Sequence, residues 1–84
     1  RPDAIVLAEA DAPCQVRIER ISDADNEMLQ YFASRGLVVD AELEVLAPEP
    51  YSDTVTVRVA GRDEAVRLGQ AAARSVWASA VTPN

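Results

Sequence analysis

The chain has 84 residues, of which 49% are hydrophobic and 26% charged. This is enough apolar side chain for one small core, and it argues against wholesale disorder. The 14 acidic and 8 basic residues give a formal net charge of −6, which disfavours direct DNA binding because the arginines are spread along the chain.

The composition also bounds the chemistry. No histidine is present, so the usual general base is missing and we expect no enzyme activity. The single cysteine, Cys14, excludes an internal disulfide and predicts a small buried apolar residue. No stretch approaches the roughly 18 apolar residues of a membrane span, so we expect no membrane association and a cytoplasmic location. The sequence starts at Arg1 and not at methionine, which predicts a fragment of a longer protein.

Residues 1–13 predict a linker or an edge strand, because a short apolar stretch at 5–8 lies between two prolines. A half-buried strand is predicted at 14–21, where apolar and polar residues alternate with a period of two. Ile21 interrupts this alternation, which predicts a bulge or the end of the strand near Arg20.

An α-helix is predicted at about residues 23–35. Met28, Leu29 and Phe32 recur at helical spacing, and Gly36 stands where a glycine commonly ends a helix. The helix therefore presents one apolar side to the core, where we expect Phe32 to pack.

The carboxylates at the start of this helix have two interpretations. Asp23, Asp25 and Glu27 place negative charge where the helix dipole favours it, and Ser22 or Asp23 can cap the first turn. Together with Asn26 they also form the densest group of oxygen ligands in the chain, of the kind that Mn²⁺ and other hard cations bind. Capping is the interpretation that needs no ion.

Four further strands follow the helix. Alternating residues predict strands at 42–45 and 55–59, and the second of these forms a hairpin around Gly61 with a strand at 65–68. A last strand is predicted at 76–81 after a short apolar turn. One helix with about five to six short strands and tight connections predicts a mainly β fold, a small barrel.

The order of these elements resembles that of FeoA-type SH3-like domains. The matching positions are apolar residues and glycines of the strands and of the helix end: Ile18, Ile21, Gly36, Leu37, Leu43, Val45, Val55, Val57, Gly61, Leu68, and Ala72 or Ala73. The resemblance covers residues 14–81 and implies an SH3-like domain at 14–84. The acidic segment before the helix is more similar to the C-terminal domain of diphtheria-toxin-repressor-like (DtxR family) regulators than to stand-alone FeoA.

This resemblance implies a non-catalytic regulatory domain of an iron- or manganese-dependent transcriptional repressor. Such a domain packs against the rest of its own chain, while DNA binding and dimerisation belong to N-terminal domains missing here. In some members it lends a glutamate, and a glutamine three residues later, to an ancillary metal site. The matching residues are Asp23 and Asn26, each one methylene shorter, and Fe²⁺ or Mn²⁺ is the implied cofactor.

Two other functions remain open. One is a stand-alone FeoA-like accessory protein of ferrous-iron transport, which would contact a permease. The other is a generic SH3-like interaction module, whose exposed aromatic residues would hold an extended proline-containing segment. Tyr51, in a proline-containing loop, and Trp77 are the candidate partner contacts for that module.

Overall fold

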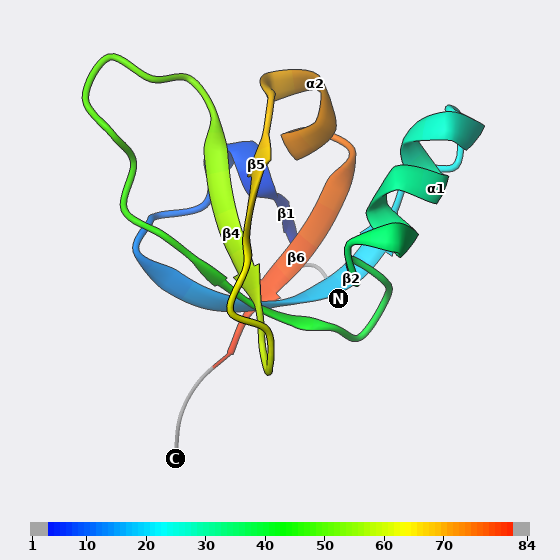
Figure 1. Ribbon diagram of the computed structural model, residues 1–84, viewed down its shortest axis with the longest axis horizontal. Coiled ribbons are helices and arrows are strands. Elements are labelled where there is room, and N and C mark those ends of the chain that lie inside the picture. The colour runs from blue at the N-terminus through cyan, green and yellow to red at the C-terminus, as the bar shows by residue number, and fades with distance from the viewer. Residues whose placement is uncertain (1–3, 82–84) are drawn as a thin grey trace.

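A six-stranded antiparallel sheet is the framework of the protein in the computed structural model, which describes residues 4–81 (Figure 1). In chain order the strands are β1 (Ile5–Val6), β2 (Cys14–Ile21), β3 (Glu42–Val45), β4 (Val55–Val59), β5 (Ala65–Leu68) and β6 (Val76–Ala80). They lie side by side in the order β1-β6-β2-β3-β4-β5. The predicted mainly β fold is confirmed.

In the described part of the chain, three short helical segments accompany the sheet. The helix predicted at about residues 23–35 is α1 (Asn26–Ser34), which starts three residues later than predicted. The segment expected as an apolar turn contains a second helix, α2 (Gln70–Ala73). A 3₁₀ turn, η1 (Leu7–Glu9), follows β1 directly. The two edge strands of the sheet are β1 and β5. The helix α2 contacts β5 and also η1, the turn that follows β1, so it connects the two edges of the sheet.

The core is built by side chains that alternate along the strands, as the sequence predicts. In β2, Val16 and Ile18 are buried whereas Arg17 between them is exposed. The buried hydrophobic residues come from every strand of the sheet except β1, from the helical segments and, at Leu37, from the connection after α1: Leu7, Val16, Ile18, Phe32, Leu37, Leu43, Val45, Val57, Val59, Val66, Leu68, Ala73, Val76 and Ala78. No polar or charged residue of the described part is buried with them.

The bulge predicted near Arg20 is confirmed in β2. Ile18 pairs with Ala78 and Arg20 with Trp77, so Glu19 is the extra residue between them. The Arg20 guanidinium carbon lies 4.1 Å from the centroid of the Trp77 ring, and Ser79 Oγ donates a 2.5 Å hydrogen bond to Glu19 Oε2. The bulge thus gives both charged residues a partner on β6.

Asp25 caps the start of α1. It has an extended backbone, and its Oδ1 accepts a 3.1 Å hydrogen bond from the Met28 amide. The prediction that Ser22 or Asp23 caps the helix is wrong. Ser22 Oγ accepts instead from the Ala24 amide, so it stabilises the turn that precedes the helix.

A Schellman motif ends α1 at Gly36. Gly36 has a φ of 81°, its amide donates to the Ala33 carbonyl, and the Leu37 amide donates to the Phe32 carbonyl. Leu37 and Phe32 are both part of the buried core. The end of the helix is therefore fixed by backbone geometry and by the core together.

Replacing Gly36 with alanine is expected to lower the free energy of unfolding by about 1–2 kcal/mol, because the left-handed conformation is unfavourable for residues with a Cβ. The added Cβ would also lie 3.0 Å from Cζ of Arg62. Gly69→Ala is the matched control, since Gly69 has a φ of −69° and no atom near the added Cβ. Urea unfolding measures the free energy of unfolding of both variants. An equal loss in Gly36→Ala and Gly69→Ala would show that the left-handed conformation of Gly36 is not the cause.

Candidate functional site

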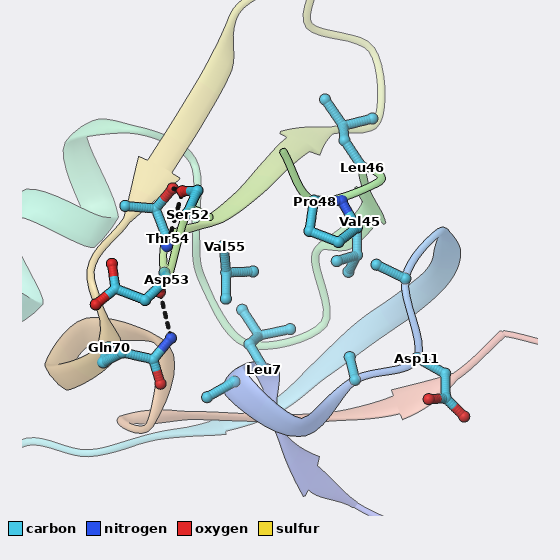
Figure 2. Close-up of a pocket in the computed structure, with 13 residues that line it drawn as sticks. Leu7, Asp11, Val45, Leu46, Pro48, Ser52, Asp53, Thr54, Val55 and Gln70 are labelled. Atoms are coloured by element: carbon cyan, nitrogen blue, oxygen red, sulfur yellow. Dashed lines mark hydrogen bonds between the residues drawn. The ribbon is translucent and has the colours of Figure 1, made fainter. Parts of the chain in front are cut away.

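A groove of about 340 Å³ opens between η1 and the long connection from β3 to β4 (Figure 2). We call it the loop groove. Residues 7–12 form one wall, residues 45–55 form the other, and α2 contributes at one end. Its lining consists of Leu7, Ala8, Ala10, Asp11, Ala12, Val45, Leu46, Pro48, Ser52, Asp53, Thr54, Val55 and Gln70.

Hydrogen bonds hold the loop wall in place. Gln70 Nε2 donates to the backbone carbonyl of Asp53, which ties the loop to α2 (Figure 2). The hydroxyls of Ser52 and Thr54 lie 2.7 Å apart, and the Leu46 amide donates to the Thr56 carbonyl where the loop leaves the sheet. These hydrogen bonds attach the loop to β4 at its base and to α2 near its end.

The described lining of the loop groove combines apolar, polar and acidic residues. Leu46 and Val55 are among its apolar residues, and Asp11 and Asp53 are the acidic residues of the described lining. The described lining residues include neither a cationic side chain nor a nucleophile paired with a base. Such a surface favours an apolar segment that carries positive charge.

Tyr51 lies in the same loop, outside the residues that line the groove. Its side chain is fully exposed and its φ is 64°. The Ser52 amide donates to the Glu49 carbonyl, and Pro50 precedes Tyr51, so residues 49–52 form a type II turn with tyrosine where glycine is preferred. An aromatic side chain is thus presented to solvent by a strained backbone.

Replacing Tyr51 with glycine is expected to stabilise the protein by about 0.5–1 kcal/mol. The left-handed conformation costs a non-glycine residue about 1–2 kcal/mol, and the greater freedom of glycine in the unfolded chain offsets about 0.5–1 kcal/mol of the gain. Tyr51→Ala keeps the strained backbone and serves as control in thermal unfolding. A gain of the same size in both variants would rule out backbone strain as the cause.

Trp77 does not lie in the loop groove. It is half-buried on β6, where it lines a separate shallow hollow with Ala4, Glu19 and Arg20. The two aromatic residues predicted as partner contacts therefore belong to different sites.

Asp23 and Asn26 are both exposed at the start of α1. In the described part of the chain, no three or more carboxylate, cysteine or histidine side chains gather into a group that could hold a metal ion. A metal bound at Asp23 and Asn26 would therefore need ligands from elsewhere, and these residues do not make a complete metal site.

Within residues 4–81, three ion pairs neutralise arginines on the surface. Arg17 pairs with Glu42, Arg35 with Glu64, and Arg58 with Glu44, at 3.6, 3.5 and 2.5 Å. Glutamates so close to these arginines disfavour phosphate binding at them. Within residues 4–81, no helix is long and apolar enough to span a membrane.

Several residues of the loop groove were not predicted from the sequence. Asp53 and Gln70 are 17 positions apart, and no local pattern marks the pair. Leu46 carried a weak signal, since it extends the apolar residues of β3 into a proline-containing segment.

Comparison with solved structures gives matches of two kinds. The chain is 34% identical, over 96% of its length, to a manganese-dependent transcriptional repressor in complex with manganese (TM-score 0.85). It is 35% identical, over 93% of its length, to a manganese-dependent transcriptional repressor (TM-score 0.82). It covers 38% and 42% of those two chains, about two-fifths of their length.

The second kind of match is a small protein. The structure of a FeoA-like protein from Clostridium acetobutylicum has a TM-score of 0.79 and 17% identity, and the match covers 98% of this chain and 92% of that one. At this identity the likeness shows the fold alone. No curated protein sequence matches significantly. Residues 5–79 match the family described as the FeoA domain, and this chain belongs to that family.

Proposed function

We propose that this chain is a non-catalytic regulatory domain of a metal-dependent transcriptional repressor that responds to iron or manganese. It packs against the DNA-binding and dimerisation domains of its own full-length chain. DNA is contacted through those domains, and the full-length protein is a dimer.

One observation carries this proposal. The identity to two manganese-dependent repressors is 34–35% over nearly the whole chain, twice the 17% identity to the FeoA-like protein. In those repressors the matching part makes up about two-fifths of the chain, as expected for one domain among several.

The surface of the domain fits this role. The loop groove offers a lining of mixed apolar and polar residues, into which a segment of the remaining chain can pack. Direct DNA binding is disfavoured by the net charge of −6 and by the ion-paired arginines. The domain would therefore act by contact with its neighbours.

The test uses the protein encoded by the complete reading frame. Mn²⁺-dependent binding of its operator DNA is measured by fluorescence anisotropy, with and without this domain. We expect deletion to change the Mn²⁺ concentration at half-maximal binding by at least about 5-fold, the lower end of the usual allosteric range. A reading frame without a DNA-binding domain, or an unchanged Mn²⁺ dependence, would reject the proposal.

Asp23 and Asn26 are proposed as donors to an ancillary Fe²⁺ or Mn²⁺ site that other parts of the protein complete. Both side chains are exposed, and an aspartate and an asparagine supply the oxygen ligands that Mn²⁺ accepts. Asp25 is less available because its carboxylate caps α1.

NMR titration of Mn²⁺ into the full-length protein tests this metal site. We expect saturable line broadening at the amides near residues 23–26, lost in Asp23→Ala and retained in Asp63→Ala, whose carboxylate lies in the β4–β5 turn. Broadening that is equal in both variants would show that Asp23 is not a ligand.

A stand-alone FeoA-like accessory protein of ferrous-iron transport is the second candidate. It is favoured by the match in size, because the FeoA-like structure is covered over 92% of its length. The complete reading frame separates the two functions, since an accessory protein of this kind would be barely longer than the present chain.

A further inference from the structure

A second cavity lies on the other side of η1 from the loop groove. It has a volume of about 240 Å³ and is lined by Ile5, Leu7, Glu9, Ala10, Asp11, Cys14, Val16, Ala78 and Ala80. We call it the β1 hollow. Leu7, Ala10 and Asp11 line both cavities and form the wall between them.

Small side chains create the β1 hollow. In the sheet, Val16 of β2 pairs with Ala80 of β6, and Ile5 of β1 pairs with Ala78 of β6. In each pair a branched side chain lies opposite an alanine, whose side chain is a single methyl group. The space next to the alanine is therefore left unfilled.

The interior of the hollow is apolar. Val16, Leu7 and Ala78 are buried in its floor, whereas Ile5 at its side leaves 44% of its surface exposed. Burial, and then the charge of Asp11, raise the pKa of the Cys14 thiol above its ordinary value. The thiol thus stays neutral near pH 7 and adds no charge to the interior.

Among the described lining residues, the charged ones are both acidic. Glu9 and Asp11 are exposed carboxylates on the η1 side of the hollow. An occupant with negative charge, such as an anionic lipid headgroup, would be repelled there, whereas a cation beside an apolar group would be attracted.

The size and the neighbouring strand point to a polypeptide as the occupant. Pockets for small-molecule ligands are typically roughly 300–1,000 Å³, and this hollow is smaller. It adjoins β1, an edge strand whose one partner among the described strands is β6. An extended segment can add to such an edge through main-chain hydrogen bonds while a side chain fills an adjacent pocket.

We propose that the β1 hollow binds an extended segment of a partner protein, in which a bulky aliphatic side chain lies next to arginine or lysine. The aliphatic side chain occupies the hollow, the cation contacts Glu9 and Asp11, and the backbone runs along β1. This inference does not depend on the repressor assignment, because it rests on the lining of the β1 hollow, which shares Leu7, Ala10 and Asp11 with the loop groove but not its other residues.

The probe is an acetylated and amidated hexapeptide of alternating arginine and leucine, titrated into the protein and followed by amide shifts. We expect saturable shifts near Cys14 and Ala78 and slower alkylation of the Cys14 thiol. The double variant Glu9→Gln/Asp11→Asn is expected to weaken binding roughly 3- to 30-fold, as for the loss of two exposed ion pairs. Peptides with glutamate for arginine, or serine for leucine, should not bind.

Two variants test the hollow itself. Ala80→Phe fills the hollow from an exposed position. Ile5→Ser replaces an apolar lining residue by a smaller polar one. One variant remains informative if the other fails to fold. Each should abolish the shifts near Cys14. Asp53→Asn, in the loop groove alone, is the matched control and should leave binding unchanged. Loss of binding in Asp53→Asn, or no saturable shift with any peptide, would overturn the proposal.

Discussion

Replacing Phe32 with alanine is expected to lower the free energy of unfolding by about 3–5 kcal/mol. Phe32 is the largest fully buried side chain, with 0% of its surface exposed, and it attaches α1 to the core. A domain of this size is stabilised by only about 4–13 kcal/mol. The substitution would therefore remove a large part of the total stability.

Tyr31→Ala is the matched control for this prediction. Tyr31 precedes Phe32 on the same helix, but 40% of its surface is exposed. It packs against the Arg35 guanidinium, whose carbon is 5.5 Å from the ring centroid, a contact that contributes about 0.5–1 kcal/mol at an exposed site. Urea unfolding of both variants measures the difference, and a similar loss in the two would mean that Phe32 is not the anchor of α1.

Replacing Leu7 with alanine is expected to cost about 2–5 kcal/mol. Leu7 lies in the three-residue turn η1, yet it is 98% buried and belongs to the main core cluster. It also forms part of the wall between the loop groove and the β1 hollow. Truncation should thus both weaken the core and connect the two cavities, which makes the Cys14 thiol react faster under native conditions.

Ile5→Ala is the control for Leu7, because Ile5 is two residues earlier and largely exposed. We expect it to cost less than about 1 kcal/mol, as for surface changes outside the core. A large loss in Leu7→Ala would place residues 5–9 inside the cooperatively folded unit. If both variants unfold like the parent, this segment behaves as a linker that docks without stabilising the domain.

The fold could be predicted where periodicity alone determines the structure. The alternation of apolar and polar residues predicted strand β2, because the core buries every second residue of a strand. Gly36 predicted the end of α1, because the left-handed backbone conformation at a helix end favours glycine. The N-cap was misplaced by two or three residues, since Ser22, Asp23 and Asp25 can all cap a helix. Only the fold of the preceding turn selects Asp25.

The candidate sites were less predictable, because they depend on contacts between segments distant in the sequence. Tyr51 and Trp77 were predicted as partner contacts, but the sequence did not show that Tyr51 is fully exposed on a loop whereas Trp77 lines a hollow with Arg20 of the neighbouring strand. The acidic start of α1 predicted possible metal ligands, yet a complete shell requires donors that local sequence does not bring together. The β1 hollow arises from cross-strand pairing of small residues, which no single segment reveals.

The wall shared by the two cavities has a thermodynamic consequence. Leu7, Ala10 and Asp11 face the loop groove on one side and the β1 hollow on the other, so a ligand that displaces this wall alters the second cavity. Linkage requires reciprocity: if occupancy of the groove changes affinity in the hollow by some factor, occupancy of the hollow changes affinity in the groove by the same factor. The short segment from Leu7 to Asp11, which begins with η1, would then couple two binding equilibria.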